Sequence, residues 1–111
     1  MNIEVNVNAG ACGFKSVIKA SSQDKRNSVI EFTTDCPSLK ILETELKTAD
    51  AYKEVFSKFG TSNVFQVYAK HCKHAACPVP TALIKAIEAS CGLALPRTVT
   101  IEIKKVEEAP A

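Results

Sequence analysis

Apolar and polar residues alternate in three segments near the start of the chain. These segments cover residues 2–8, 14–20 and 28–34, and in each of them the main apolar positions fall on one side. A two-residue period is typical of strands that have one face against a core and one face in solvent. Two glycines follow the first segment and a polar stretch follows the second. Such short connections favour antiparallel neighbours, so the pattern predicts a three-stranded meander.

The pattern then changes to the spacing of amphipathic helices. Pro37 suits the first turn of a helix, and a stripe of leucines that ends at Leu46 follows it. The same spacing predicts further helices over residues 48–60, 64–72 and 78–92, two of which end at a glycine. The β-branched and aromatic residues of the segment 64–72 leave a strand open there as the alternative. The middle of the chain is therefore expected to be mostly helical.

A short alternating segment returns near the end of the chain. Val99, Ile101 and Ile103 alternate with polar residues, which predicts a late C-terminal strand, and residues 105–111 are expected to form a flexible tail. At 111 residues the chain is long enough for one core. The whole pattern predicts a single α+β domain over residues 1–104, in which helices pack on one face of the meander.

Three of the five cysteines stand at predicted junctions between elements. Cys12 lies in the first turn, Cys36 follows the third strand, and Cys77 precedes the last helix. In a three-stranded meander, the first turn and the end of the third strand lie at the same end of the sheet. Helix N-termini stabilise thiolates, so cysteines at such positions favour metal binding or sulfur chemistry over simple packing. Cys91, on the inner side of the last helix, is expected in the core.

Composition narrows the classes of function. The net charge of +2 and the dispersed lysines do not indicate a nucleic-acid partner, and no apolar stretch is long enough to span a membrane. The N-terminus lacks the pattern of a signal peptide, so a reducing cytoplasm is the expected compartment. In a reducing compartment, five cysteines are better explained as metal ligands, reactive thiols or core residues than as disulfide partners. No motif of a hydrolase or kinase is present, and the protein is not expected to be a conventional enzyme.

The three junctions resemble those of a known family. Residues 11–13 form an Ala-Cys-Gly turn between two strands, residues 31–36 lead from a strand into Cys36, and residues 76–87 place Cys77 before a helix. The separations are 24 residues from Cys12 to Cys36 and 41 residues from Cys36 to Cys77. This order is similar to that of the iron–sulfur cluster scaffold proteins of the IscU type, also found as the N-terminal domain of NifU.

The resemblance implies an α+β fold of the kind shared by IscU-like and SufE-like proteins. It also implies that Cys12, Cys36 and Cys77 together bind an iron–sulfur cluster or zinc, or receive persulfide sulfur. A cysteine desulfurase or a cluster acceptor protein is the partner it implies. The chain has Phe14 where the family has an aspartate and Ala76 where it usually has a histidine.

A fourth ligand would come from elsewhere, and Cys72 and His74 are the nearest candidates. Cys72 is as well suited to packing or to the surface as to ligation, while His71 is expected to be a solvated residue at a helix end. The oligomeric state stays open, because a second copy could also complete the site.

Two other functions remain open. The sequence Cys-Pro-Val-Pro at residues 77–80, followed by a helix, looks locally like the motif of TusA-type sulfurtransferases, in which a cysteine at a helix start carries a persulfide. This similarity implies a sulfur carrier that uses Cys77 alone. A non-catalytic regulatory domain, with structural zinc or with no metal, is the third hypothesis.

Overall fold

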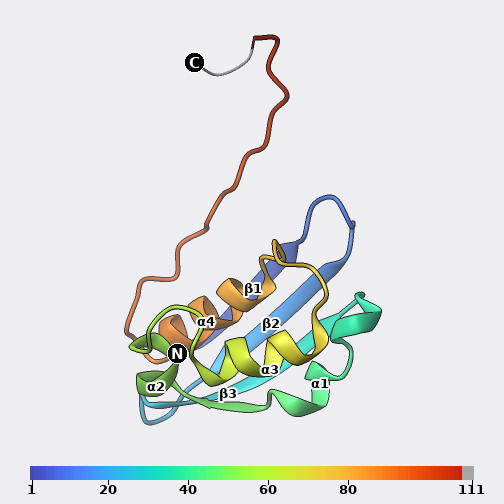
Figure 1. Cartoon of the computed structure of the whole chain (residues 1–111). Helices are drawn as coiled ribbons and strands as arrows, with labels where there is room; N and C mark the ends of the chain where they lie inside the picture. Colours follow the sequence, from blue (N-terminus) through green and yellow to red (C-terminus); the bar gives the residue numbers. More distant parts are fainter. Residues whose placement is uncertain (109–111) are drawn as a thin grey trace.

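The computed structural model describes residues 1–108 and shows an α+β fold (Figure 1). Four antiparallel strands form one sheet in the order β1-β2-β3-β4. The strands are β1 (Asn2–Asn8), β2 (Lys15–Ser21), β3 (Asn27–Thr34) and β4 (Thr48–Asp50). A 3₁₀ turn, η1 (Pro37–Leu39), precedes the helices α1 (Leu42–Glu45), α2 (Ala51–Val55), α3 (Asn63–His71) and α4 (Val79–Ser90).

The first three strands form the predicted meander. Ile18 on β2 lies between Val5 on β1 and Phe32 on β3, so the apolar residues of all three strands meet on one face. Burial alternates strictly along β3, where Ile30 and Phe32 are buried and their neighbours in sequence are exposed. This is the pattern of a sheet that is covered on one side only.

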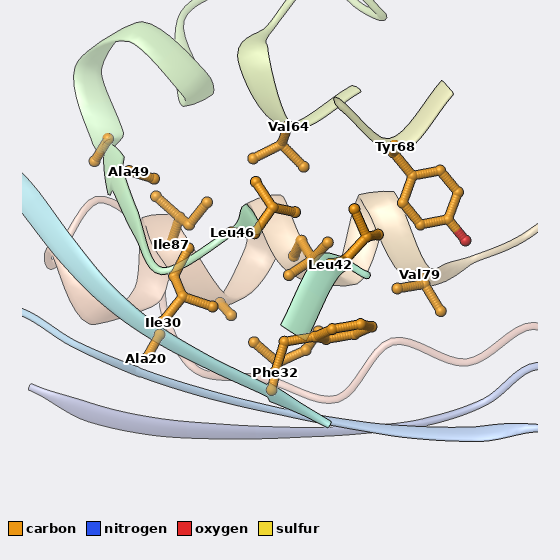
Figure 2. Close-up of a cluster of buried hydrophobic side chains, with 14 of the residues drawn as sticks. Ala20, Ile30, Phe32, Leu42, Leu46, Ala49, Val64, Tyr68, Val79 and Ile87 are labelled. Carbon is orange, nitrogen blue, oxygen red and sulfur yellow. The ribbon is translucent and has the colours of Figure 1, made fainter. Parts of the chain in front are cut away.

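The helices cover that one face and close the core. α4 packs on β1 and β2, while α1 packs on β3 (Figure 1). Figure 2 shows the resulting cluster, in which Leu42 and Leu46 meet Ile30, Val64 and Ile87. The leucine stripe predicted after Pro37 and the inner face predicted for the last helix are therefore confirmed.

The direction of α4 follows from contacts at its last residue. Ser90 Oγ lies 2.8 Å from Ser28 Oγ near the start of β3, and the Ser90 carbonyl accepts from the Met1 amino group at 3.4 Å. The last turn of α4 therefore lies where β1 and β3 start. Its first turn consequently lies at the opposite end of the sheet, where β1 and β3 finish.

The sheet has a fourth strand where the sequence predicted the start of a helix. It is β4, only three residues long, which pairs with β3 and then leads directly into α2. The helix predicted over residues 48–60 therefore starts late, at Ala51, and ends early, at Val55. Asp50 causes the late start, because its side chain accepts the N–H groups of Tyr52 and Lys53 and so caps the helix.

The predicted late strand is wrong for the described chain. Residues 94–108 carry no regular secondary structure and extend away from the body (Figure 1). Val99, Ile101 and Ile103 are 56%, 75% and 91% exposed. The alternation of the sequence is real, but no strand within residues 1–108 lies beside it. The final part of the predicted tail, residues 109–111, lies outside the described residues. No helix of the described chain is both long and apolar enough to cross a membrane.

Candidate thiol site

The three junction cysteines come from one end of the sheet. Cys12 lies in the turn that joins β1 to β2, and Cys36 follows β3 by two residues. The Asp35 N–H donates to the Lys15 carbonyl at 2.9 Å, which ties the end of β3 to the start of β2. Cys77 lies just before α4, whose first turn is at this same end (Figure 1). The three segments that carry these cysteines therefore lie at one end of the sheet, as the meander predicts for Cys12 and Cys36.

Cys12 is the most exposed of the three and sits in a tight turn. The Gly13 N–H donates to the Gly10 carbonyl at 2.9 Å, and both glycines have positive φ, which suits residues without a side chain. The Gly10 N–H also donates to Asn8 Oδ1 at 3.1 Å. The turn is thus held mainly by its own hydrogen bonds, and the Cys12 thiol is open to solvent.

Cys36 is half-buried at the start of η1. Its N–H donates to Thr34 Oγ1 at 3.1 Å, and its carbonyl accepts from the Leu39 N–H. Thr34 Oγ1 is itself 2.8 Å from Ser16 Oγ, so the position of Cys36 depends on a buried hydroxyl pair. The Cys36 side chain packs against the edge of the core.

Cys77 belongs to a small cluster with Tyr68 and Cys72. The Tyr68 hydroxyl is 2.5 Å from Cys77 Sγ, and the backbone N–H of Val79, in the first turn of α4, is among the groups that lower the pKa of this thiol. Cys72, the residue after α3, lies close enough to interact with both groups. Figure 2 shows the Tyr68 ring at the rim of the core with its hydroxyl turned away from the aliphatic side chains.

Burial dominates the acidity of this cluster. It raises the pKa of the Cys77 thiol, and the neighbouring Cys72 raises that pKa further, while the bonds from Tyr68 and Val79 lower it. The pKa of Tyr68 is likewise raised, by burial first and then by the two thiols. The position of Cys77 at a helix start suggested a stabilised thiolate. Only Tyr68 and Val79 act in that direction, and their effect is smaller than that of burial. The net shift favours the neutral thiol.

The two histidines differ in their surroundings. His71, at the end of α3, pairs with Glu45 of α1, with 3.0 Å between Nε2 and Oε2, so it is an inter-helix contact as well as a helix-end residue. His74 is exposed in the loop between α3 and α4. Its carbonyl accepts from Cys72 Sγ at 3.3 Å and from the Cys77 N–H at 3.3 Å. His74 thus contributes to the loop through its backbone.

The described chain brings some of the predicted ligands together and not others. Cys72 and Cys77 are neighbours, whereas Cys91 is buried in the core as predicted. Within residues 1–108, no group of three or more histidine, cysteine, aspartate and glutamate side chains is placed to hold a metal ion. The donor types suit zinc or iron, so any such site requires the exposed Cys12 turn or the α3–α4 loop to move.

Tyr68 is the site residue that the sequence did not identify as such. Its side chain lies on the buried side of α3 and is almost fully buried. The sequence spacing could have indicated this contact, because Tyr68 precedes Cys72 by one helical turn and the two therefore share a helix face. Its hydroxyl also needs a partner when the ring is buried, and the thiols provide it.

Comparison with known proteins gives one match. A family model described as "Family of unknown function (DUF6951)" matches residues 3–103. The chain belongs to this family. The match covers nearly all of the sheet, the helices of the described chain and most of the extended C-terminal segment. No curated protein and no solved structure matches the chain.

Proposed function

We propose that this DUF6951 protein has an IscU-like fold and binds an iron–sulfur cluster or a thiophilic metal ion. The ligands are Cys12, Cys36 and Cys77. The observation that supports this proposal is that the three cysteines lie at three separate junctions, the β1–β2 turn, the end of β3 and the start of α4, at the same end of one sheet. Thiolates are the preferred ligands of iron–sulfur clusters and are common ligands of zinc.

Binding closes the site around Cys77. Cys36 and Cys77 are half-buried beside the same core, while the Cys12 turn is exposed and is held mainly by local hydrogen bonds. Movement of that turn is therefore the least costly way to bring a third sulfur in. Cys72 is the best placed fourth ligand because it already adjoins Cys77, and His74 is the alternative. A cysteine desulfurase or a cluster acceptor protein is the partner expected if the bound group is an iron–sulfur cluster.

Metal analysis of cysteine variants tests the proposal. The protein is purified without oxygen, reconstituted with ferrous iron and sulfide or with zinc, and analysed for bound metal and sulfide. Cys12→Ser, Cys36→Ser and Cys77→Ser are each expected to lose most of the bound metal, because a three-thiolate site fails when any one ligand is removed. Cys91→Ala is the control, since Cys91 lies in the core. Equal metal content in all four variants would refute the proposal.

A second function is favoured by the donors around one sulfur. The Tyr68 hydroxyl contacts Cys77 Sγ, and Tyr68 and Val79 both lower the pKa of this thiol against the effect of burial, which favours the charged sulfur needed for reaction. In a sulfur carrier, the Cys77 thiolate attacks the outer sulfur of a persulfide on a donor cysteine. The donor S–S bond breaks, the donor cysteine leaves as a thiolate, and Cys77 keeps the persulfide.

Mass spectrometry separates the two functions. After incubation with a cysteine desulfurase and cysteine, a carrier gains one sulfur atom on the peptide that contains Cys77. It does so in the Cys12→Ser and Cys36→Ser variants as well. A metal scaffold without carrier activity gives no such peptide. Sulfur found equally on all exposed cysteines would count against a dedicated role of Cys77.

A further inference from the structure

The extended C-terminal segment has the composition of a strand, but no strand within residues 1–108 pairs with it. Residues 98–104 alternate threonine and charged residues with Val99, Ile101 and Ile103, and all seven are exposed. β-Branched residues at a two-residue period are typical of a strand with one apolar face. Exposed β-branched residues in extended backbone readily pair with a free sheet edge. The family match extends to residue 103, so this segment belongs to the shared unit.

One sheet edge in the described chain is open to receive such a strand. β1 is the first strand in the order β1-β2-β3-β4, so one side of its backbone pairs with β2 and the other side has no neighbouring strand. β1 has seven residues, the same length as the alternating part of the segment. Its apolar side chains, Ile3, Val5 and Val7, are only half-buried beneath α4.

We propose that residues 98–104 pair with the free edge of β1 in a second copy of the chain. The added strand places Val99, Ile101 and Ile103 on the face that carries Ile3, Val5 and Val7, where they complete the burial of that edge. Its other face places Glu102 and Lys104 beside the polar face of β1, which carries Glu4 and three asparagines. Both faces of the segment therefore match the corresponding face of β1.

The exit of the segment from the body favours a second copy over the chain's own β1. The Leu93 N–H donates to the Glu88 carbonyl and Gly92 has positive φ, which ends α4 and redirects the chain. The segment then leaves the body and gives the molecule a long axis of 51 Å against 29 and 24 Å (Figure 1). α4 ends beside Met1, at the start of β1, and residues 94–108 lead from there away from the body (Figure 1). Two copies can therefore exchange segments reciprocally about a two-fold axis.

Sedimentation of matched full-length variants tests the exchange. Wild type is expected to form a dimer at micromolar concentration. Ile101→Lys is expected to weaken dimerisation by at least about tenfold, because it puts a charge on the buried face of the added strand. Thr100→Lys is the matched control: it adds the same charge one residue away, on the face toward solvent. A monomer at every concentration, or equal weakening by both variants, would overturn the proposal.

Hydrogen exchange identifies which edge the segment occupies. Exchange with a second copy protects the amides of residues 98–104 and of β1, and the protection increases with protein concentration. Concentration-independent protection in a monomer would show pairing with the chain's own β1 and overturn the assignment to a second copy. Unprotected amides in a concentrated dimer would equally overturn it, because the dimer would then be formed by another surface.

Discussion

At the scale of single residues, the cluster of Tyr68, Cys72 and Cys77 is the most specific chemical feature of the described chain. The sequence placed Cys77 at a helix start, and this is where it lies. It did not give the acidity of the thiol, because that depends on burial by the core and on a tyrosine that only the folded α3 brings into contact. The identity of a single residue in the sequence does not show which side chains it will contact in the folded protein.

Substitutions at Tyr68 and Cys72 are expected to move the pKa of Cys77 in opposite directions. Tyr68→Phe removes a hydrogen bond that lowers this pKa, so the pKa rises further above the ordinary cysteine value. Cys72→Ala removes a neighbour that raises it, so the pKa falls. Only the thiolate is alkylated, so at mildly alkaline pH the first variant should react more slowly at Cys77 and the second faster.

The measurement is the pH dependence of iodoacetamide labelling at Cys77, followed by peptide mass spectrometry. Tyr52→Phe is the control, because Tyr52 is exposed on α2 and packs against Phe56, away from the thiols. Identical labelling profiles in the Tyr68, Cys72 and Tyr52 variants would show that the cluster does not control the Cys77 thiol.

At the scale of elements, the hydrophobic periods of strands and helices predicted the meander, α3 and α4. They failed for segments whose structure depends on pairing with another strand. β4 is too short for a two-residue period to be visible, and it exists because β3 supplies the ladder. Residues 99–103 have the period but no neighbouring strand within residues 1–108. The helix predicted over residues 48–60 ends early. Phe56 and Phe59 fit its spacing, yet they are 70% and 87% exposed.

One buried contact joins the last turn of α4 to the start of β3, and its loss should be measurable. Ser90 Oγ bonds Ser28 Oγ at 2.8 Å and also donates to the Ile87 carbonyl. Ser90→Ala leaves the Ser28 hydroxyl buried without a partner, which costs about 1–3 kcal/mol in the free energy of unfolding. The double variant Ser28→Ala/Ser90→Ala removes both hydroxyls and is expected to be less destabilised than the sum of the two single variants.

Urea unfolding followed by circular dichroism gives these free energies. Ser57→Ala is an exposed-serine control and should change the stability little. Strict additivity of the Ser28 and Ser90 effects would show that the two hydroxyls do not act as a pair.

At the scale of the whole molecule, the sheet topology brings Cys12 and Cys36 to one end of the sheet, and this was predictable, whereas the direction of α4 was not. A three-stranded meander requires the Cys12 turn and the Cys36 junction to share an end, and the direction of α4 adds Cys77. The distances between the sulfurs were not predictable, because they depend on the turn around Cys12 and on the α3–α4 loop. Those two segments determine whether the three sulfurs reach a common ion.

X-ray absorption on the metal-loaded protein tests this convergence most directly. At least three sulfur ligands at about 2.3 Å from zinc or iron are expected, and the metal that Cys12→Ser retains should show fewer sulfur ligands. A first shell made only of nitrogen and oxygen, or a sulfur count unaffected by loss of Cys12, Cys36 and Cys77 in turn, would contradict it.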